Sequence, residues 1–203
     1  MLELDKGKVS ELFSFLQGGF FVRDVKVGCS VSAFLTGQIG ISPEYLRDHI
    51  STVFLDGKPV DDLDSATIRN KSRLALSSAL PGLVGATMRQ GSVFASFRRS
   101  ITYRESGLRA GGEGVVHLKL FNVVMKDLGP SLLTKGILVN ACELKNFMKE
   151  HHDLLKGCTK ILFNNGPIEI GALRSNDFCK AFQLVSLSVE MTAADGMTSR
   201  TGD

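Results

Sequence analysis

Long apolar runs are missing from this sequence of 203 residues. No run approaches the roughly 18 residues that a membrane-spanning helix needs, so we expect no membrane segment. The first residues, MLELDKGK, mix both signs of charge and contain no apolar stretch of the kind found in secretory signals. We therefore expect a cytoplasmic protein. Its hydrophobic content of 43% is ordinary for a folded globular chain.

Known cofactor motifs are also missing. The stretch PGLVGATMRQG, residues 81–91, lacks the Lys-Ser/Thr pair of a phosphate-binding loop and the G-x-G-x-x-G pattern of a dinucleotide-binding turn. The cysteines form no C-x-x-C pair, and none of the common zinc-ligand spacings occurs. The sequence therefore predicts no cofactor and no metal. The cysteines are expected to be small core residues with free thiols: Cys29, Cys142, Cys158 and Cys179.

Apolar spacing predicts the elements at the start of the chain. Residues 9–16 repeat apolar side chains at helical spacing and are followed by two glycines, which indicates an amphipathic helix. Residues 20–27 alternate as a half-buried strand does. Ser30 and Ser42 stand at positions where each can cap a helix, and Pro43 suits a first helical position.

From residue 52 the pattern changes to strands. TVFLDGKPVDD carries Asp56-Gly57, a favoured two-residue hairpin turn, between two short arms. A further strand is expected around Leu74 and Leu76, and Pro81 ends it because proline interrupts ladder pairing.

This order of elements resembles a known family. Residues 20–85, with one strand, a helix and then strands around an Asp-Gly turn, resemble the later half of a β-grasp, ubiquitin-like domain of the sulfur-carrier type. The residues that carry the resemblance are Phe54, Asp56, Gly57, Val60, Leu74, Leu76 and Gly82. A complete β-grasp begins with a hairpin, and MLEL is the candidate for its other strand. Carrier chemistry is not implied, because it needs a free C-terminal glycine pair, whereas here the chain continues beyond Gly85.

The second half is predicted to be rich in strands, with one prominent helix. Its expected elements are a strand over 93–103, a glycine-rich loop over 106–114, a strand over 115–121, a strand over 136–141, a helix over 144–155, a hairpin over 160–170 and a strand over 185–191.

Arginines are concentrated in the middle of the chain, although the net charge is only +3. On the expected strand Arg98 faces solvent, and Arg104 and Arg109 flank the glycine-rich loop. Their guanidinium groups can converge on a phosphate or carboxylate, and interleaved aromatic residues are typical of surfaces that stack single-stranded nucleic acid. Arg99 has inward parity and requires a buried acid or a bulge. The predicted anion-binding residues are Arg89, Arg98, Arg99, Arg104 and Arg109.

Acidic residues gather just before this region. Asp56, Asp61, Asp62 and Asp64 are accompanied by a single cation, Lys58. Their spacing matches neither a calcium-binding loop nor a paired-carboxylate site, so a solvated hairpin is the simplest interpretation. These carboxylates can also attract the arginines of a second copy, which makes a homo-oligomer possible.

A catalytic pocket is a further alternative. Cys142 lies near an expected helix start, where a thiol can become reactive, and His117 and His151 are candidate partners. A zinc site that uses Cys142, His151, His152 and Cys158 is not expected. Cys142 and His151 are nine residues apart, more than two turns along a helix.

We therefore expect an α+β fold with mixed or antiparallel sheets. Residues 1–91 form the β-grasp-like part, 92–191 the strand-rich part and 192–203 a flexible tail, and both halves can share one sheet. The expected function is a non-catalytic binding or interaction module with an unknown protein partner, because no triad, metal set or cofactor loop occurs and β-grasp folds often serve as scaffolds. Binding of an anion or nucleic acid through the arginines, and an enzyme around Cys142 and His117, are the alternatives.

Overall fold

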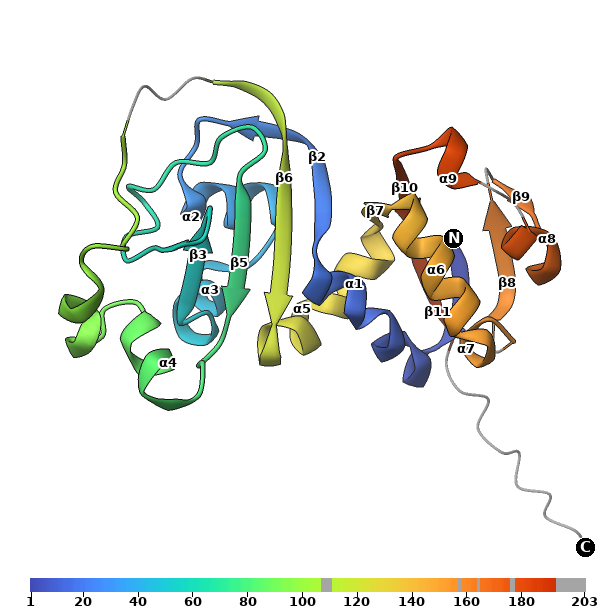
Figure 1. The fold of residues 1–203 in the computed structure, drawn as a ribbon, viewed down its shortest axis with the longest axis horizontal. Helices are drawn as coiled ribbons and strands as arrows, with labels where there is room; N and C mark the ends of the chain where they lie inside the picture. Colours follow the sequence, from blue (N-terminus) through green and yellow to red (C-terminus); the bar gives the residue numbers. More distant parts are fainter. Residues whose placement is uncertain (107–110, 157, 164, 176–177, 193–203) are drawn as a thin grey trace, which may run out of the picture.

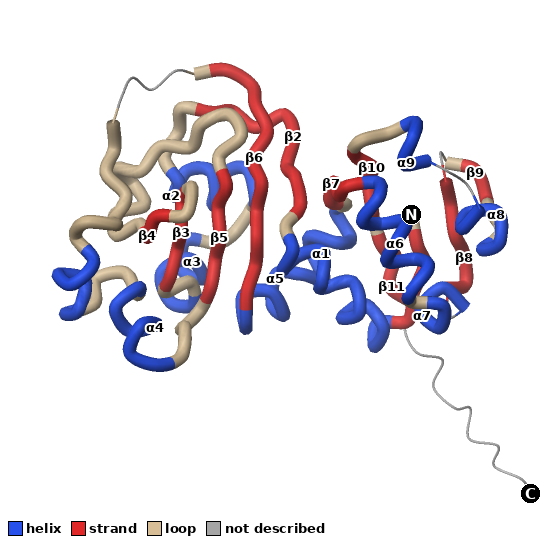
Figure 2. The backbone as a smooth tube through the Cα atoms, viewed as in Figure 1, coloured by secondary structure: helices blue, strands red, loops and turns tan. Residues whose placement is uncertain are grey.

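Two β-sheets with helices packed around them make up the structure (Figure 1). This computed structural model describes residues 1–106, 111–156, 158–163, 165–175 and 178–192. As expected, the fold is α+β with mixed sheets. Figure 2 shows the strands in two groups, and two strands of the larger sheet, residues 137–140 and 184–187, lie in the group that contains the smaller sheet.

The strands are β1 (Leu2–Asp5), β2 (Phe20–Val27), β3 (Thr52–Leu55), β4 (Lys58–Pro59), β5 (Arg73–Ser77), β6 (Gly112–Phe121), β7 (Ile137–Asn140), β8 (Cys158–Phe163), β9 (Gly166–Pro167), β10 (Leu184–Leu187) and β11 (Val189–Thr192). The α-helices are α1 (Phe13–Gly18), α2 (Val31–Ala33), α3 (Pro43–His49), α4 (Gly82–Met88), α5 (Asn122–Lys135), α6 (Ala141–Glu150), α7 (His152–Lys156), α8 (Ile170–Ser175) and α9 (Phe178–Ala181). Two 3₁₀ segments, η1 (Lys6–Leu12) and η3 (Val93–Arg98), and a π-helical segment, η2 (Phe34–Ile39), accompany them.

The larger sheet has the strand order β10-β7-β2-β6-β5-β3-β4. β5 and β6 run parallel, whereas its other neighbouring strands are antiparallel. Strands β2 to β5 precede residue 91, and β6, β7 and β10 follow it. Both halves of the chain therefore contribute strands to one sheet.

The smaller sheet has the order β11-β1-β8-β9. Residues 2–4 of MLEL, with Asp5, form β1, which pairs with β11, where Leu2 lies opposite Val189, and also with β8. It does not lie beside β2, as a β-grasp hairpin would require. Leu2 and Leu4 are buried in the smaller sheet, which gives their alternating apolar side chains a core. β2 lies instead between β7 and β6 and is antiparallel to both, with Phe20 opposite Leu118 on β6.

The local signals of the first half are confirmed. Ser30 caps α2 by accepting a hydrogen bond from the Ala33 N–H, and Ser42 caps α3 in the same way through Tyr45, each at 3.1 Å. Asp56 and Gly57 join β3 to β4 with φ values of 52° and 81°. Positive φ at both positions is the geometry of the hairpin turn that this dipeptide favours.

The predicted strand over 93–103 is wrong. Residues 93–98 form η3, which Ser92 caps by accepting a hydrogen bond from the Phe94 N–H. Its alternating apolar residues are not buried, since Val93 and Phe97 are 85% and 79% exposed. A segment with alternating apolar side chains forms a strand only where another strand has a free edge to pair with it. Here the position next to β5 is occupied by β3 on one side and β6 on the other.

Helix α5 is missing from the sequence prediction, which places no element between the strands over 115–121 and 136–141 and in which Gly129 and Pro130 are poor helix formers. Both residues lie inside this 14-residue helix. A Cβ on Gly129 would lie 2.7 Å from Leu16 Cδ1, so glycine lets α1 and α5 pack closely. The second half thus has two prominent helices, α5 and α6, rather than one.

The predicted strand over 185–191 is also corrected. It divides at Ser188 into β10 in the larger sheet and β11 in the smaller one. The Ser188 carbonyl accepts a hydrogen bond from the Leu2 N–H at 2.8 Å, which fixes the point where the two sheets part.

The remaining predictions have mixed outcomes. The hairpin over 160–170 is confirmed as β8 and β9, and the helix over 144–155 is present as α6 and α7. In the glycine-rich loop, residues 107–110 lie outside the described residues, and 112–114 already belong to β6. Thr192 ends β11, and residues 193–203 of the predicted tail lie outside the described part. Among the described helices, none has the length and hydrophobicity needed to cross a membrane.

Candidate functional site

Arg98 is buried, whereas the predicted strand placed it in solvent. Its side chain is 2% exposed. Its N–H groups donate to the Thr87 and Arg89 carbonyls, to Thr102 Oγ1 at 2.8 Å and to both oxygens of Asp61, with Nη1 3.0 Å from Oδ2. These bonds account for all five donors of a guanidinium group. Arg98 therefore has no donor left for a ligand.

The other predicted arginines do not form one cluster. Arg99 and Arg104 are exposed and line an open hollow of about 370 Å³. Asp61, whose two carboxylate oxygens are paired with Arg98, lines the same hollow. Arg89 is exposed outside the described lining of this hollow, and Arg109 lies outside the described residues. The structure thus brings two of the five predicted arginines together.

The larger sheet has one buried face and one open face. The buried face consists of aliphatic residues at alternate positions: Val53, Leu55, Leu74, Leu76, Val116, Leu118 and Leu120. Figure 1 shows α2 and α3 behind β3, β5 and β6, and draws no helix over the near side of β5 and β6. Alternate residues point to opposite faces of a strand. The open face therefore carries Phe54, Arg73, Ala75, His117, Lys119 and Phe121, and Ser77 on the same face is buried.

A groove runs along this open face. It has a volume of about 450 Å³, and its lining includes Phe54, Phe121, Arg73 and Lys119, with Leu80 from the segment that follows β5. The register explains the groove. β5 presents small side chains such as Ala75 between the larger ones of β3 and β6, because Phe54 lies opposite Ala75 and Ala75 opposite Lys119. Since β3 and β6 flank β5, their backbones lie about 10 Å apart.

Beside the groove, two basic side chains, Arg73 on β5 and His117 on β6, lie next to each other on the open face. Arg73 lies opposite His117, and His117 opposite Phe21 on β2, whose ring centroid is 4.8 Å from the imidazole. Burial, followed by the charge of Lys119, lowers the pKa of His117 below its usual 6.5. Arg73 lowers this pKa further, whereas a hydrogen bond with the Gly19 backbone and the charge of Glu143 raise it.

Arg73 and Lys119 are absent from the set of residues predicted from the sequence. The alternation in RLALS and VVHLKLF could have identified them, because it places Arg73 and Lys119 on the strand face away from the buried leucines. Arginine density favours residues 89–109 instead. The pairing of β5 with β6, which brings Arg73 and Lys119 onto one face, involves segments about 40 residues apart and is not visible in local pattern.

Cys142 and His117 do not share a described pocket. Cys142 is exposed in the first turn of α6, where its N–H donates to Asn140 Oδ1 at 2.9 Å. His151 stacks on Phe147 with ring centroids 4.0 Å apart, and its Nδ1 is 3.9 Å from Glu11 Oε2. The described residues therefore do not assemble Cys142, His117 and His151 into one site. In the described part of the chain, no group of three or more His, Cys, Asp or Glu could hold a metal ion.

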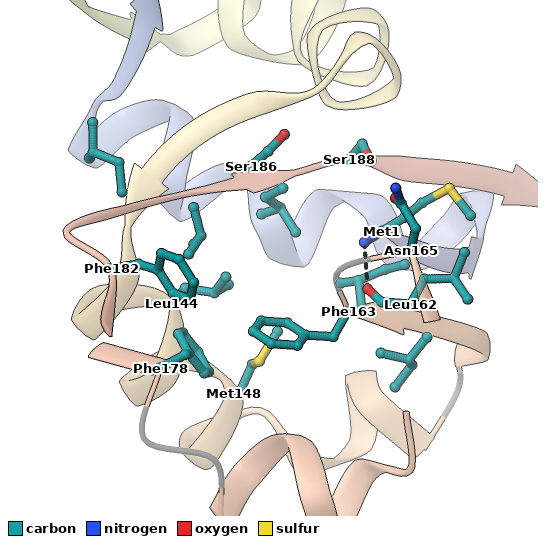
Figure 3. Close-up of a pocket in the computed structure, with 15 residues that line it drawn as sticks. Met1, Leu144, Met148, Leu162, Phe163, Asn165, Phe178, Phe182, Ser186 and Ser188 are labelled. Atoms are coloured by element: carbon teal, nitrogen blue, oxygen red, sulfur yellow. Dashed lines mark hydrogen bonds between the residues drawn. The ribbon is translucent and has the colours of Figure 1, made fainter. Parts of the chain in front are cut away.

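A second cavity lies where the two sheets part (Figure 3). It has a volume of about 370 Å³ and is lined mainly by apolar side chains from α6, β8, β10 and the region of α9. The lining aromatic and sulfur-bearing side chains are Phe163, Phe178, Phe182, Met148 and Met1. The Met1 amino group at its edge donates a hydrogen bond to the Leu162 carbonyl at 2.9 Å.

Comparisons with protein-family models, with curated proteins and with solved structures give no match to this chain. The groove on the larger sheet and the cavity between the sheets are therefore the features from which a function can be inferred.

Proposed function

We propose that the protein is a non-catalytic binding module, and that it binds single-stranded nucleic acid on the open face of the larger sheet. The observation that carries this proposal is the groove in which Phe54 and Phe121 flank small side chains while Arg73 and Lys119 lie along the same surface. Nucleic acid is also the ligand class that the sequence suggested for the arginines of residues 89–109, but the proposed binding residues are different ones.

The chemistry of the groove fits a base and a phosphate together. Aromatic rings stack on bases of any identity, and this stacking is worth about 1 to 3 kcal/mol per base. Lys119 and Arg73 supply cations within reach of a phosphate backbone that runs across β5 and β6. Because the face is shallow and open, it suits a strand of several nucleotides better than a single enclosed one. Duplex DNA would hide its bases from the rings.

We also propose that β2, β6, β5, β3 and β4 form a β-grasp-like unit in which β6 takes the position expected for MLEL. The antiparallel pairing of β2 with β6, the helical segment after β2 and the β3–β4 hairpin support this. Cross-strand amide contacts between Val22 and Val116 in an NMR spectrum are the expected signature. Contacts of Val22 with Leu2–Asp5 instead would contradict it.

Fluorescence anisotropy with labelled oligothymidylate of about 12 nucleotides tests the nucleic-acid proposal, since single-strand binding folds commonly cover about 4 to 16 nucleotides. We expect saturable binding at low salt. Replacing Lys119 or Arg73 by Gln should weaken binding and reduce the salt dependence, by about 0.7 in the logarithmic slope for each phosphate that is no longer neutralised.

Matched variants separate this face from the arginines around η3. Phe121→Leu should weaken binding several-fold, whereas Phe97→Leu, R99Q and R104Q should leave it nearly unchanged. Thymidine monophosphate and duplex DNA of the same length complete the comparison, and both should bind more weakly than the single strand. Absence of binding at low salt, or equal losses in the R99Q and K119Q variants, would overturn the proposal.

A further inference from the structure

The cavity in Figure 3 is a wedge between diverging strands. β10 belongs to the larger sheet, and β1 and β8 belong to the smaller one. The two sheets are joined where the Leu2 N–H donates to the Ser188 carbonyl, and they separate from there toward Leu184. The space between β10 and β8 widens into the cavity, whose lining includes both strands.

One edge of β10 has no neighbouring strand within the described residues. β10 is the terminal strand of its sheet and pairs with β7 on its other side. In an antiparallel strand the N–H and C=O of one residue point to the same side, and this side alternates from residue to residue. The Gln183 carbonyl accepts from Ala141 on the β7 side, whereas the Ser188 carbonyl accepts from Leu2 on the opposite side. The backbone groups of Leu184 and Ser186 therefore point away from β7, along the wedge.

Most side chains around the wedge are apolar. Leu144 and Met148 from α6, Phe163 from β8, and Phe178 and Phe182 around α9 surround it. Among the lining residues that the structure describes, none has a charged side chain. Phe182 is 45% exposed at its rim, an uncommon position for so large an apolar side chain. Figure 3 shows the Ser186 hydroxyl directed away from the centre of the cavity, so β10 meets the wedge chiefly with backbone and aliphatic groups.

We propose that this wedge binds an extended peptide with uncharged apolar side chains, which adds as a strand to the free edge of β10. An open strand edge supplies main-chain hydrogen bonds, and pockets for alternate side chains supply specificity, which is how β-strand addition works. The adjoining cavity is the second requirement, and its described lining residues, none with a charged side chain, suit apolar side chains of a peptide. The charged Met1 amino group at its edge is hydrogen-bonded to the Leu162 carbonyl. A small molecule would use the cavity but not the edge of β10.

Ser186→Pro tests the role of the strand edge. Proline removes the outward N–H at this position but leaves the pairing with β7 intact, and proline is tolerated on edge strands where its nitrogen faces away from the ladder. Ser186→Ala is the matched control because it keeps the N–H. Phe182→Ala tests the apolar wall, and Phe97→Ala, at an exposed phenylalanine on η3, is its control.

A random heptapeptide library should be selected in parallel on the wild-type chain and on S186P, with circular dichroism to confirm that both fold. We expect the wild type to enrich peptides with alternating Val, Ile or Phe. Their affinity should fall at least tenfold in S186P and F182A and stay within twofold in S186A and F97A. N-methylation of alternate peptide bonds should abolish their binding.

Two results would overturn this inference. One is that no enriched peptide distinguishes the wild type from S186P. The other is that the neutral dye N-phenyl-1-naphthylamine binds and is lost in F182A while peptides do not compete with it, which would assign the cavity to small apolar molecules. Neither result depends on nucleic-acid binding at the opposite end of the sheet.

Discussion

Arg98 and Asp61, 37 residues apart in the chain, form a two-point ion pair in which the guanidinium is buried and the carboxylate is 37% exposed. The pair joins η3 to the segment that follows β4. Because Arg98 also binds the carbonyls of Thr87 and Arg89, it holds the end of α4 against the same segment. The arginine that the sequence marks as a ligand contact is thus a structural one.

Arg98→Met should destabilise the fold by about 3 kcal/mol, because it leaves Asp61 and two backbone carbonyls without their donor. Arg99→Met, one residue further along and exposed, should change the free energy of unfolding by less than about 0.5 kcal/mol. Urea denaturation of both variants measures the difference. Equal small effects would show that the Arg98 pair contributes nothing to stability.

Gly85→Ala should destabilise α4. A Cβ at this position would lie 2.1 Å from the Leu80 carbonyl oxygen and 2.4 Å from its carbon, and both atoms are backbone. The resulting shift should cost about 1 to 3 kcal/mol. Since Leu80 lines the groove, oligothymidylate binding should weaken as well. Gly37→Ala is the control, because a Cβ there meets nothing within 4 Å. A stable G85A variant with unchanged binding would contradict the prediction.

Acid should remove the contribution of Glu105 to stability. Burial opposes its ionisation, but hydrogen bonds from Thr67, Arg69 and Tyr103 and the charge of Arg69 lower its pKa from 4.5 to about 2. A carboxylate whose pKa is lower in the folded state stabilises the fold above its unfolded pKa, and this contribution is lost as the pH falls through the folded value. The difference in unfolding free energy between wild type and E105Q should therefore narrow between pH 4.5 and about pH 2. A difference independent of pH would refute this assignment.

Mild acid should strengthen nucleic-acid binding through His117. Its pKa lies below 6.5 because of burial and of the neighbouring Lys119 and Arg73, although Gly19 and Glu143 oppose this. Folding therefore favours the neutral imidazole, and a bound phosphate favours the charged one. Affinity should rise as the pH falls from 7 toward 5, by about tenfold for each unit by which binding raises the pKa.

The variant H117Q isolates this effect. Its affinity should change much less over the same pH range, and anisotropy titrations at constant ionic strength measure both proteins. A wild-type affinity that is flat with pH, or one that falls in acid, would exclude His117 from the binding face.

Much of the fold follows from local sequence signals. Caps at Ser30 and Ser42, the Asp56-Gly57 turn and the alternation in residues 115–121 are decided within a few residues, so the elements around them were predictable. The errors arise where tertiary contacts override the local pattern. Gly129 and Pro130 stay in a helix because α1 packs against it, and residues 93–98 leave the extended conformation although their side chains alternate.

The candidate site was less predictable than the fold. Its surface exists because β5 pairs with β6, and this pairing brings Arg73 beside His117 and Ala75 beside Lys119. No local rule states which strands will be neighbours. The density of arginine in residues 89–109 does not separate Arg98, which is buried, from the exposed Arg99 and Arg104, because a buried arginine and an exposed one have the same appearance in sequence.

The pairing of β1 has a consequence for synthesis and folding. Residues 2–5 are synthesised well before their partners, residues 158–161 and 189–192. The LELD segment must therefore wait, as an unpaired strand, until nearly all of the described chain has been made. Exposed unpaired strands invite association with other chains, and charged side chains restrain it. Glu3 and Asp5 alternate with the buried leucines, so the unpaired segment carries two charges that oppose such association.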